Sequence, residues 1–122
     1  MTLKIVTEGS NPTTIKLDGR LDTHTAPDLD KALDGVLARP GLSRLVFDLS
    51  RLEYLSSAGI RCFVRARKAI EPKGGKVAIV NPQPGVRKVL EIVKAIPGGI
   101  FASIEELDAY LDEMQRKVRD PD

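Results

Sequence analysis

The order of strand-like and helix-like segments is the feature that most constrains how this chain folds. After two N-terminal β-rich runs, helical periodicity and β-strand runs take turns along the sequence. The expected strands are residues 3–7, 13–17, 45–49 and 76–80, with a short edge strand at 100–101. Four helices are expected, each marked by apolar residues at helical spacing, and they follow residues 25, 56, 85 and 103. The first two strands form an antiparallel hairpin, and the later strand–helix–strand units imply right-handed crossovers. The sequence therefore predicts an α/β fold, with a mixed, mostly parallel sheet of four to five strands and about four helices.

No linker, internal repeat or low-complexity segment divides the 122 residues. A chain of this length fits one domain, which we expect over residues 1–122, with its core at about 3–112 and a C-terminal tail at about 118–122. The last helix is predicted from a capping box that joins Ser103 to Glu106. Its expected buried face consists of Leu107, Leu111 and Met114.

Composition argues against several classes of function. The net charge is only +2, and the chain has no Trp, three Phe and two Tyr, so we expect no direct nucleic-acid partner. Cys62 and His24 are the only residues of their types, which predicts no internal disulfide, no metal site and no cofactor. The N-terminus does not read as a signal peptide, and no apolar run approaches the roughly 18 residues of a membrane span. We therefore expect a cytoplasmic protein without a membrane partner.

A pair of serines at the junction of strand and helix is the strongest local candidate for a site. Residues 45–49 read as a buried central strand, and residues 50–55 are expected to connect it to the next helix. Ser56 and Ser57 stand where that helix begins. A hydroxyl there can cap the free backbone N–H groups of the first turn, and the same place favours a phosphate. The residues alone leave both interpretations open, structural caps or a switch.

Four motifs, in a consistent order, carry a family resemblance. Gly-Arg-Leu-Asp-Thr-His-Thr-Ala stands at 19–26, and Leu-Val-Phe-Asp-Leu-Ser at 45–50 is followed by Tyr-Leu-Ser-Ser-Ala-Gly-Ile at 54–60. Gly-Gly-Lys-Val at 74–77 and Pro-Gly-Val-Arg-Lys-Val-Leu at 84–90 also fit. Through these residues the chain resembles the bacterial anti-sigma factor antagonists of the STAS domain family, over roughly residues 3–112.

The resemblance implies a binding protein and not an enzyme, with no catalytic residues. In such antagonists the unmodified form binds an anti-sigma factor that is also a serine kinase, which frees a sigma factor and so regulates transcription. The kinase uses ATP to phosphorylate a serine at the start of this helix, and the phosphate ends the interaction. A PP2C-type phosphatase reverses the modification.

The family pattern implies that Ser57 is the phosphate acceptor, with Ser56 as the second choice. When the pattern is aligned on Gly59, its Asp falls on Ser56, Ala58 replaces a second hydroxyl residue and Arg61 replaces a final Gly. The residues expected to bind the partner are Asp22, Thr23, Ser56, Ser57, Ala58, Gly59 and Arg61.

Two expectations about this surface follow. Asp22 matches a family aspartate, and it either contacts the partner or closes a turn after the second strand. The Ser57 hydroxyl is expected to be displayed at the surface, so that a phosphate blocks docking and leaves the fold unchanged. Ser57→Asp is then expected to weaken partner binding with little change in melting temperature.

Two other classes of function remain for comparison. Ser56 and Arg61 depart from the family pattern, which is consistent with a non-switching STAS module of a transporter or a larger signalling complex. A small enzyme or nucleotide binder is disfavoured, because the sequence shows no phosphate loop, no His cluster and no nucleophile–base pair.

Overall fold

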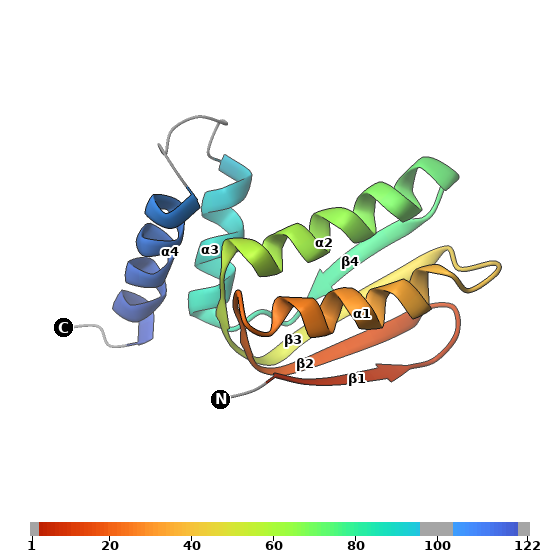
Figure 1. Ribbon diagram of the computed structural model, residues 1–122, viewed down its shortest axis with the longest axis horizontal. Helices are drawn as coiled ribbons and strands as arrows, with labels where there is room; N and C mark the ends of the chain where they lie inside the picture. The colour runs from red at the N-terminus through yellow and green to blue at the C-terminus, as the bar shows by residue number, and fades with distance from the viewer. Residues whose placement is uncertain (1–2, 96–103, 120–122) are drawn as a thin grey trace.

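A four-stranded mixed sheet forms the base of the molecule (Figure 1). The computed structural model describes residues 3–95 and 104–119. The strands are β1 (Leu3–Glu8), β2 (Thr13–Leu21), β3 (Arg44–Leu55) and β4 (Lys76–Val80), and they lie side by side in that order. β1 is antiparallel to β2, whereas β2 with β3 and β3 with β4 are parallel. The predicted fold class is therefore confirmed, and the edge strand expected at 100–101 lies outside the described residues.

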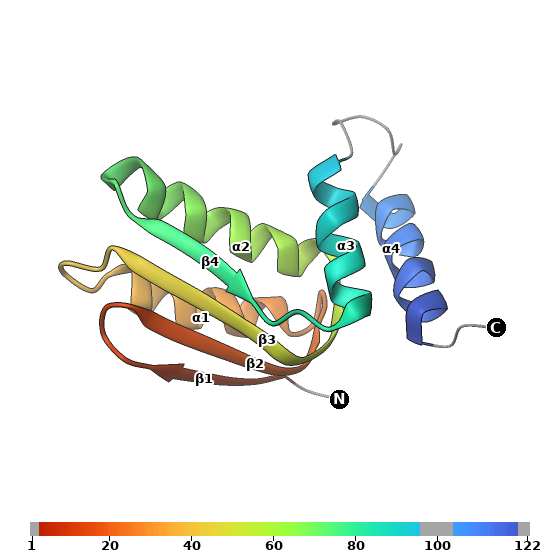
Figure 2. The same cartoon turned by 180° about the vertical axis from the view of Figure 1, so that it is seen from behind.

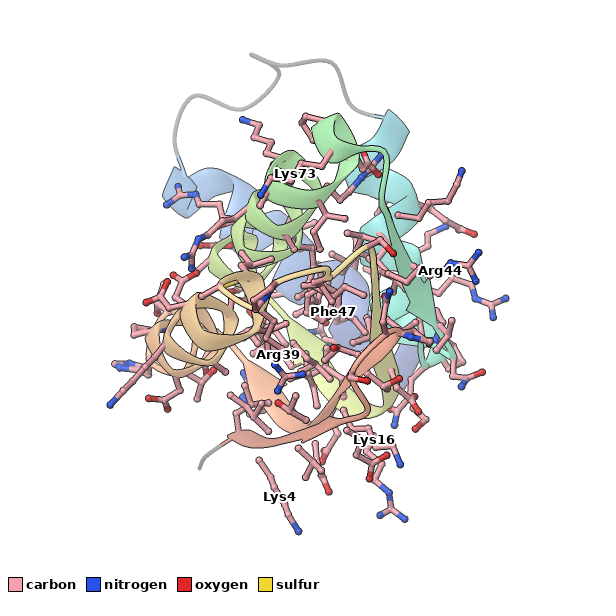
Figure 3. The ribbon with its side chains drawn as sticks, turned by 90° about the vertical axis from the view of Figure 1, so that its right-hand side faces the viewer. Lys4, Lys16, Arg39, Arg44, Phe47 and Lys73 are labelled. Carbon is pink, nitrogen blue, oxygen red and sulfur yellow. The ribbon has the colours of Figure 1, made fainter. Side chains whose placement is uncertain are left out.

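Helices cover one face and one end of the sheet. They are α1 (Ala26–Leu37), α2 (Ser57–Ile70), α3 (Pro84–Ala95) and α4 (Ile104–Arg119), with a short 3-10 turn, η1 (Glu71–Lys73), after α2. α1 and α2 pack on the same face, and α3 and α4 lie side by side at the end where β3 leads into α2 (Figures 1 and 2). Lys4 and Lys16 point away from the helices, on the open face of the sheet (Figure 3). The part of the expected tail at 120–122 lies outside the described residues.

The core lies between the sheet and the α1–α2 layer. On β2 every second residue from Thr13 to Leu21 is buried, which is the period-2 pattern of a strand with one face in the core. Phe47 in the first half of β3 is fully buried (Figure 3), and its ring centroid lies 4.7 Å from that of Phe63 on α2. These contacts fix α2, and therefore its first turn, over the parallel strands.

Two strands are longer than predicted. β2 continues through Gly19 to Leu21, and β3 continues through residues 50–55, so the expectation of a connection there was wrong. Register shifts between β2 and β3 keep the two strands paired to their ends, and Gly19, with φ of 118°, supplies the backbone freedom at one of them. Leu52 faces the core between the exposed Arg51 and Glu53, so the alternation of a strand is kept around it. β3 thereby delivers the serine pair directly beside the end of β2.

Candidate functional site

The candidate site forms where β2 and β3 end next to each other. Leu21 pairs with Leu55 in the parallel ladder, and the Ser56 N–H donates a 2.9 Å hydrogen bond to the Leu21 carbonyl. Two chain segments therefore meet at this edge, the 22–25 loop after β2 and the serine pair after β3. The carboxyl edge of parallel strands is where α/β folds most often place a binding site.

Asp22 organises the 22–25 loop from within. Its Oδ1 accepts hydrogen bonds from the backbone N–H groups of His24, at 3.0 Å, and Thr25, at 3.1 Å. The Thr25 hydroxyl donates to the Arg20 carbonyl at 2.8 Å and accepts from the Asp22 N–H at 2.9 Å. Partial burial alone raises the pKa of Asp22, but these hydrogen bonds, with the Arg20 charge, outweigh it and leave the pKa below its ordinary value. The observed hydrogen bonds fit the interpretation that Asp22 closes a turn after the second strand. Thr23 is exposed in this loop.

Ser56 and Ser57 occupy the predicted position but not the predicted environment. Ser56 is the N-cap residue of α2, in an extended conformation, yet its side chain makes no capping hydrogen bond. The two residues are 3% and 6% exposed, and both hydroxyl oxygens are buried without a hydrogen-bond partner. The expectation that the Ser57 hydroxyl is displayed at the surface was therefore wrong. The distant helix α4 contacts this segment.

Two α4 side chains bind the segment that the serines occupy. Asp108 Oδ1 accepts a 2.9 Å hydrogen bond from the Ser57 N–H, which is the capping role that the sequence left open for the serines. Gln115, only 2% exposed, accepts from the Leu55 N–H at 2.7 Å and donates to the Leu55 carbonyl at 3.0 Å. Sequence reasoning missed both residues. Their spacing from Leu111, at i−3 and i+4, places all three on one helix face and was the available signal.

The α4 contact extends to Tyr54. Burial raises the pKa of the Tyr54 hydroxyl, and the carboxylates of Asp112 and Asp108 add to the rise. The Arg20 guanidinium lies 4.0 Å from the Tyr54 ring centroid, and its Nε is 3.8 Å from Asp22 Oδ2. Tyr54 and Arg20 thus connect the 22–25 loop to the surface that α4 covers.

The remaining predicted residues divide into packing and exposed positions. A Cβ built on Gly59 would lie 2.5 Å from Leu21 Cγ and 2.7 Å from Leu55 Cδ1, so the glycine permits the close approach of α2 to the strand ends. Ala58 is half-buried, and Arg61, one turn beyond Ser57, is exposed. The structure therefore brings all seven expected residues to one region but leaves only some of them accessible.

Cys62 lies on α2 after the serine pair, and its thiol is buried. Burial, with the Asp30 carboxylate nearby, raises the pKa of the Cys62 thiol to about 12, which leaves the thiol protonated and unreactive at neutral pH. Within residues 3–95 and 104–119, no group of three or more His, Cys, Asp or Glu side chains is placed to hold a metal ion. Over the same ranges, every helix is too short or too polar to cross a membrane.

Comparison with known proteins places these observations in a family. The STAS domain model matches residues 4–107. An anti-sigma F factor antagonist of Paenibacillus polymyxa is 28% identical over 78 residues, which is 64% of this chain and 67% of the relative. A putative anti-sigma factor antagonist of Bordetella bronchiseptica, BtrV, is 34% identical over 76 residues, 62% of this chain and 65% of the relative. The match thus spans about two thirds of each of these relatives.

One solved structure shows how far the fold is shared. An anti-sigma factor antagonist from Mycobacterium paratuberculosis superimposes with a TM-score of 0.67 at 24% identity. The superposition covers 97% of this chain and 95% of that one, so the likeness extends over nearly the whole of both folds.

Proposed function

The chain belongs to the STAS domain family, and on that premise we propose that it is an anti-sigma factor antagonist, a protein-binding switch that regulates transcription. The observation that carries the proposal is the serine pair in the first turn of α2, held beside the 22–25 loop at the carboxyl edge of the sheet. The names of the relatives support an anti-sigma factor as the partner. This partner is also the serine kinase, Ser57 is the acceptor with Ser56 as the second choice, and a PP2C-type phosphatase removes the phosphate.

The effect of a phosphate follows from its charge and its position. Phosphoserine adds about −1.5 to −2 charges and three strong acceptors, which the N–H groups of a helix N-terminus favour. The Ser57 N–H is already bound by the Asp108 carboxylate, so a phosphate on Ser57 competes with Asp108 for that donor. Arg61 is exposed and takes part in none of the ion pairs among the described residues, and it lies one turn away as a counter-charge. A bulky anion at this edge also obstructs a partner packed against it.

Partner capture with and without a charge at position 57 tests the proposal. Immobilised wild-type protein is expected to retain an anti-sigma factor, identified by mass spectrometry, and Ser57→Asp is expected to weaken that binding roughly a thousandfold, equivalent to about 4 kcal/mol. Ser10→Asp is the matched control, because Ser10 is exposed in the hairpin turn and the variant adds the same charge. Equal loss of binding in both variants contradicts a local effect at the site.

Mapping the phosphate gives an independent check. After incubation of the captured pair with ATP, one phosphate is expected on Ser57, and Ser56 is the second choice. A phosphate found on Thr23 or Thr25 contradicts the assignment of the site to the first turn of α2.

A second candidate function has an observation in its favour. Both serine hydroxyls are sealed, and Ser56 stands where the family has Asp, which suits a STAS module that binds a transporter or signalling complex without being modified. For such a module, no kinase labels the protein, and the same partner is retained by wild type and by Ser57→Asp.

A further inference from the structure

The helix α4 contacts the segment that holds the two candidate serines, whose hydroxyl oxygens are buried. We propose that α4 is an autoinhibitory helix, whose docked state shields the Ser56 and Ser57 hydroxyls and whose undocked state exposes them together with the first turn of α2. The contact between α4 and the first turn of α2 is observed, and its regulatory role rests on the proposed function. In these terms α4 controls when the site is available to a kinase.

Gln115 binds the end of β3 in the docked state. Its side-chain amide binds both backbone groups of Leu55, the last residue of β3, and its Nε2 also donates to the Leu111 carbonyl at 3.2 Å within α4. The Leu55 N–H and carbonyl need a partner when buried. Separation of α4 from the strand therefore breaks two hydrogen bonds but leaves both backbone groups free to bind water.

Asp108 makes docking and phosphorylation mutually exclusive. Its carboxylate lies on the Ser57 N–H, at the helix N-terminus where a phosphate on Ser57 would also bind. Two anionic groups cannot share this donor without strong repulsion, because the site is shielded from solvent. A phosphate on Ser57 therefore keeps α4 undocked, and docked α4 keeps Ser57 unmodified.

The described side chains of α4 contribute little to the hydrophobic core, which favours reversible docking. Among the described α4 side chains, Leu111 is the one that belongs to the hydrophobic core, while Asp112, Arg116 and Lys117 are exposed. The docked state also buries two serine hydroxyls without partners, which opposes docking. Most of the hydrophobic core comes from the sheet, α1 and α2, which is the part expected to stay folded when α4 leaves.

Thiol labelling at position 57 measures the opening without any kinase. The probe is Ser57→Cys in a Cys62→Ala background, treated with 5,5′-dithiobis(2-nitrobenzoic acid). Labelling rates are measured as a function of pH and compared where they no longer rise, because the thiol is then fully ionised. With wild-type α4, labelling is expected to be far slower than that of the urea-unfolded chain. Gln115→Ala is expected to accelerate it about tenfold or more, each tenfold corresponding to about 1.4 kcal/mol.

A matched α4 variant separates docking from a general effect on the helix. Glu113→Gln alters an ion pair with Arg116 inside α4, so its labelling rate is expected to stay within about twofold of wild-type α4. Labelling of wild-type α4 at the unfolded rate, or no acceleration by Gln115→Ala, overturns the proposal. If Gln115→Ala also loosens the sheet, judged by hydrogen exchange at Phe47, then Asp108→Asn decides, and a lack of acceleration there overturns it.

The labelling result and the capture result answer different questions. Slow labelling that Gln115→Ala relieves supports the autoinhibitory helix even where Ser57→Asp leaves partner capture unchanged, and in that case only the proposed switch fails. Fast labelling in every variant, together with loss of capture by Ser57→Asp, contradicts the autoinhibitory helix and supports the proposed switch.

Discussion

An aspartate at position 57 is expected to repel the Asp108 carboxylate and release α4. Asp108 Oδ1 lies 2.9 Å from the Ser57 backbone nitrogen, so a carboxylate on residue 57 enters the same small site. With the two carboxylates taken as about 5 Å apart and an effective dielectric constant of about 20, their repulsion is about 3 kcal/mol. The helix dipole returns at most about 1 kcal/mol to an anion at the N-terminus. The net cost to α4 docking is therefore about 2 kcal/mol.

Native-state hydrogen exchange at Leu55 reads this cost directly, because the Leu55 N–H is held by Gln115 of α4. Ser57→Asp is expected to speed the exchange of that amide about 30-fold, whereas the Phe47 amide in the first half of β3 stays protected. The sealed position thus changes the expectation for Ser57→Asp, which now includes a local loss of structure beside the sheet.

Asp108→Asn and Ser57→Asp together form a double-mutant cycle. Asparagine keeps the shape of the side chain and removes the charge, so Ser57→Asp is expected to cost much less in the Asp108→Asn background. The coupling between the two positions is expected to be about 2 kcal/mol or more, outside the range of independent sites. Effects that add within about 0.5 kcal/mol refute the reasoning that the two carboxylates compete for one place.

Two further variants test the parts of the site that hold its shape. Gly59→Ala is expected to lower the free energy of unfolding in urea by about 1–3 kcal/mol, because its Cβ would lie 2.5 Å from a leucine side chain of β2. Gly35→Ala in α1 is the control, because a Cβ there meets nothing within 4 Å. This variant is expected to raise the free energy of unfolding by up to about 1 kcal/mol, since alanine favours a helix over glycine. Equal effects of the two variants contradict the packing argument. The lowered pKa of Asp22 means that its contribution to stability is complete above its ordinary pKa of 3.8 and is lost as the pH falls through the folded value. Melting temperatures of Asp22→Asn are therefore expected to fall less steeply than those of wild type between about pH 5 and pH 3, and identical slopes contradict the role of Asp22 in closing the loop.

The sequence predicted what depends on local pattern. Alternating burial on β2, the hairpin and the order of strands and helices all follow from periodicity and turn residues, and they agree with the structure. The extension of β3 was missed because Ser50, Arg51 and Glu53 are polar. An exposed position on a strand accepts such residues as readily as a loop does.

The position of the candidate site was predictable, but its closure was not. Motif spacing placed Ser57 at the first turn of α2, and local capping rules offered a serine as one possible cap. The actual cap, Asp108, is 51 residues away in the sequence, and the bond between Gln115 and Leu55 spans 60 residues. Contacts of this range depend on how α4 packs against the rest of the fold, which no local window contains.

The side-chain amide of Gln115 binds the N–H and the carbonyl of Leu55, two groups that a neighbouring strand would otherwise bind. A primary amide presents a donor N–H and an acceptor oxygen on the same side, and among side chains only Gln and the shorter Asn have this group. Glutamate at 115 would keep the acceptor and lose the donor, and leucine would lose both. The end of the central strand is thus completed by a single residue of a helix, and this mimicry restricts position 115 by hydrogen-bonding chemistry more than by size.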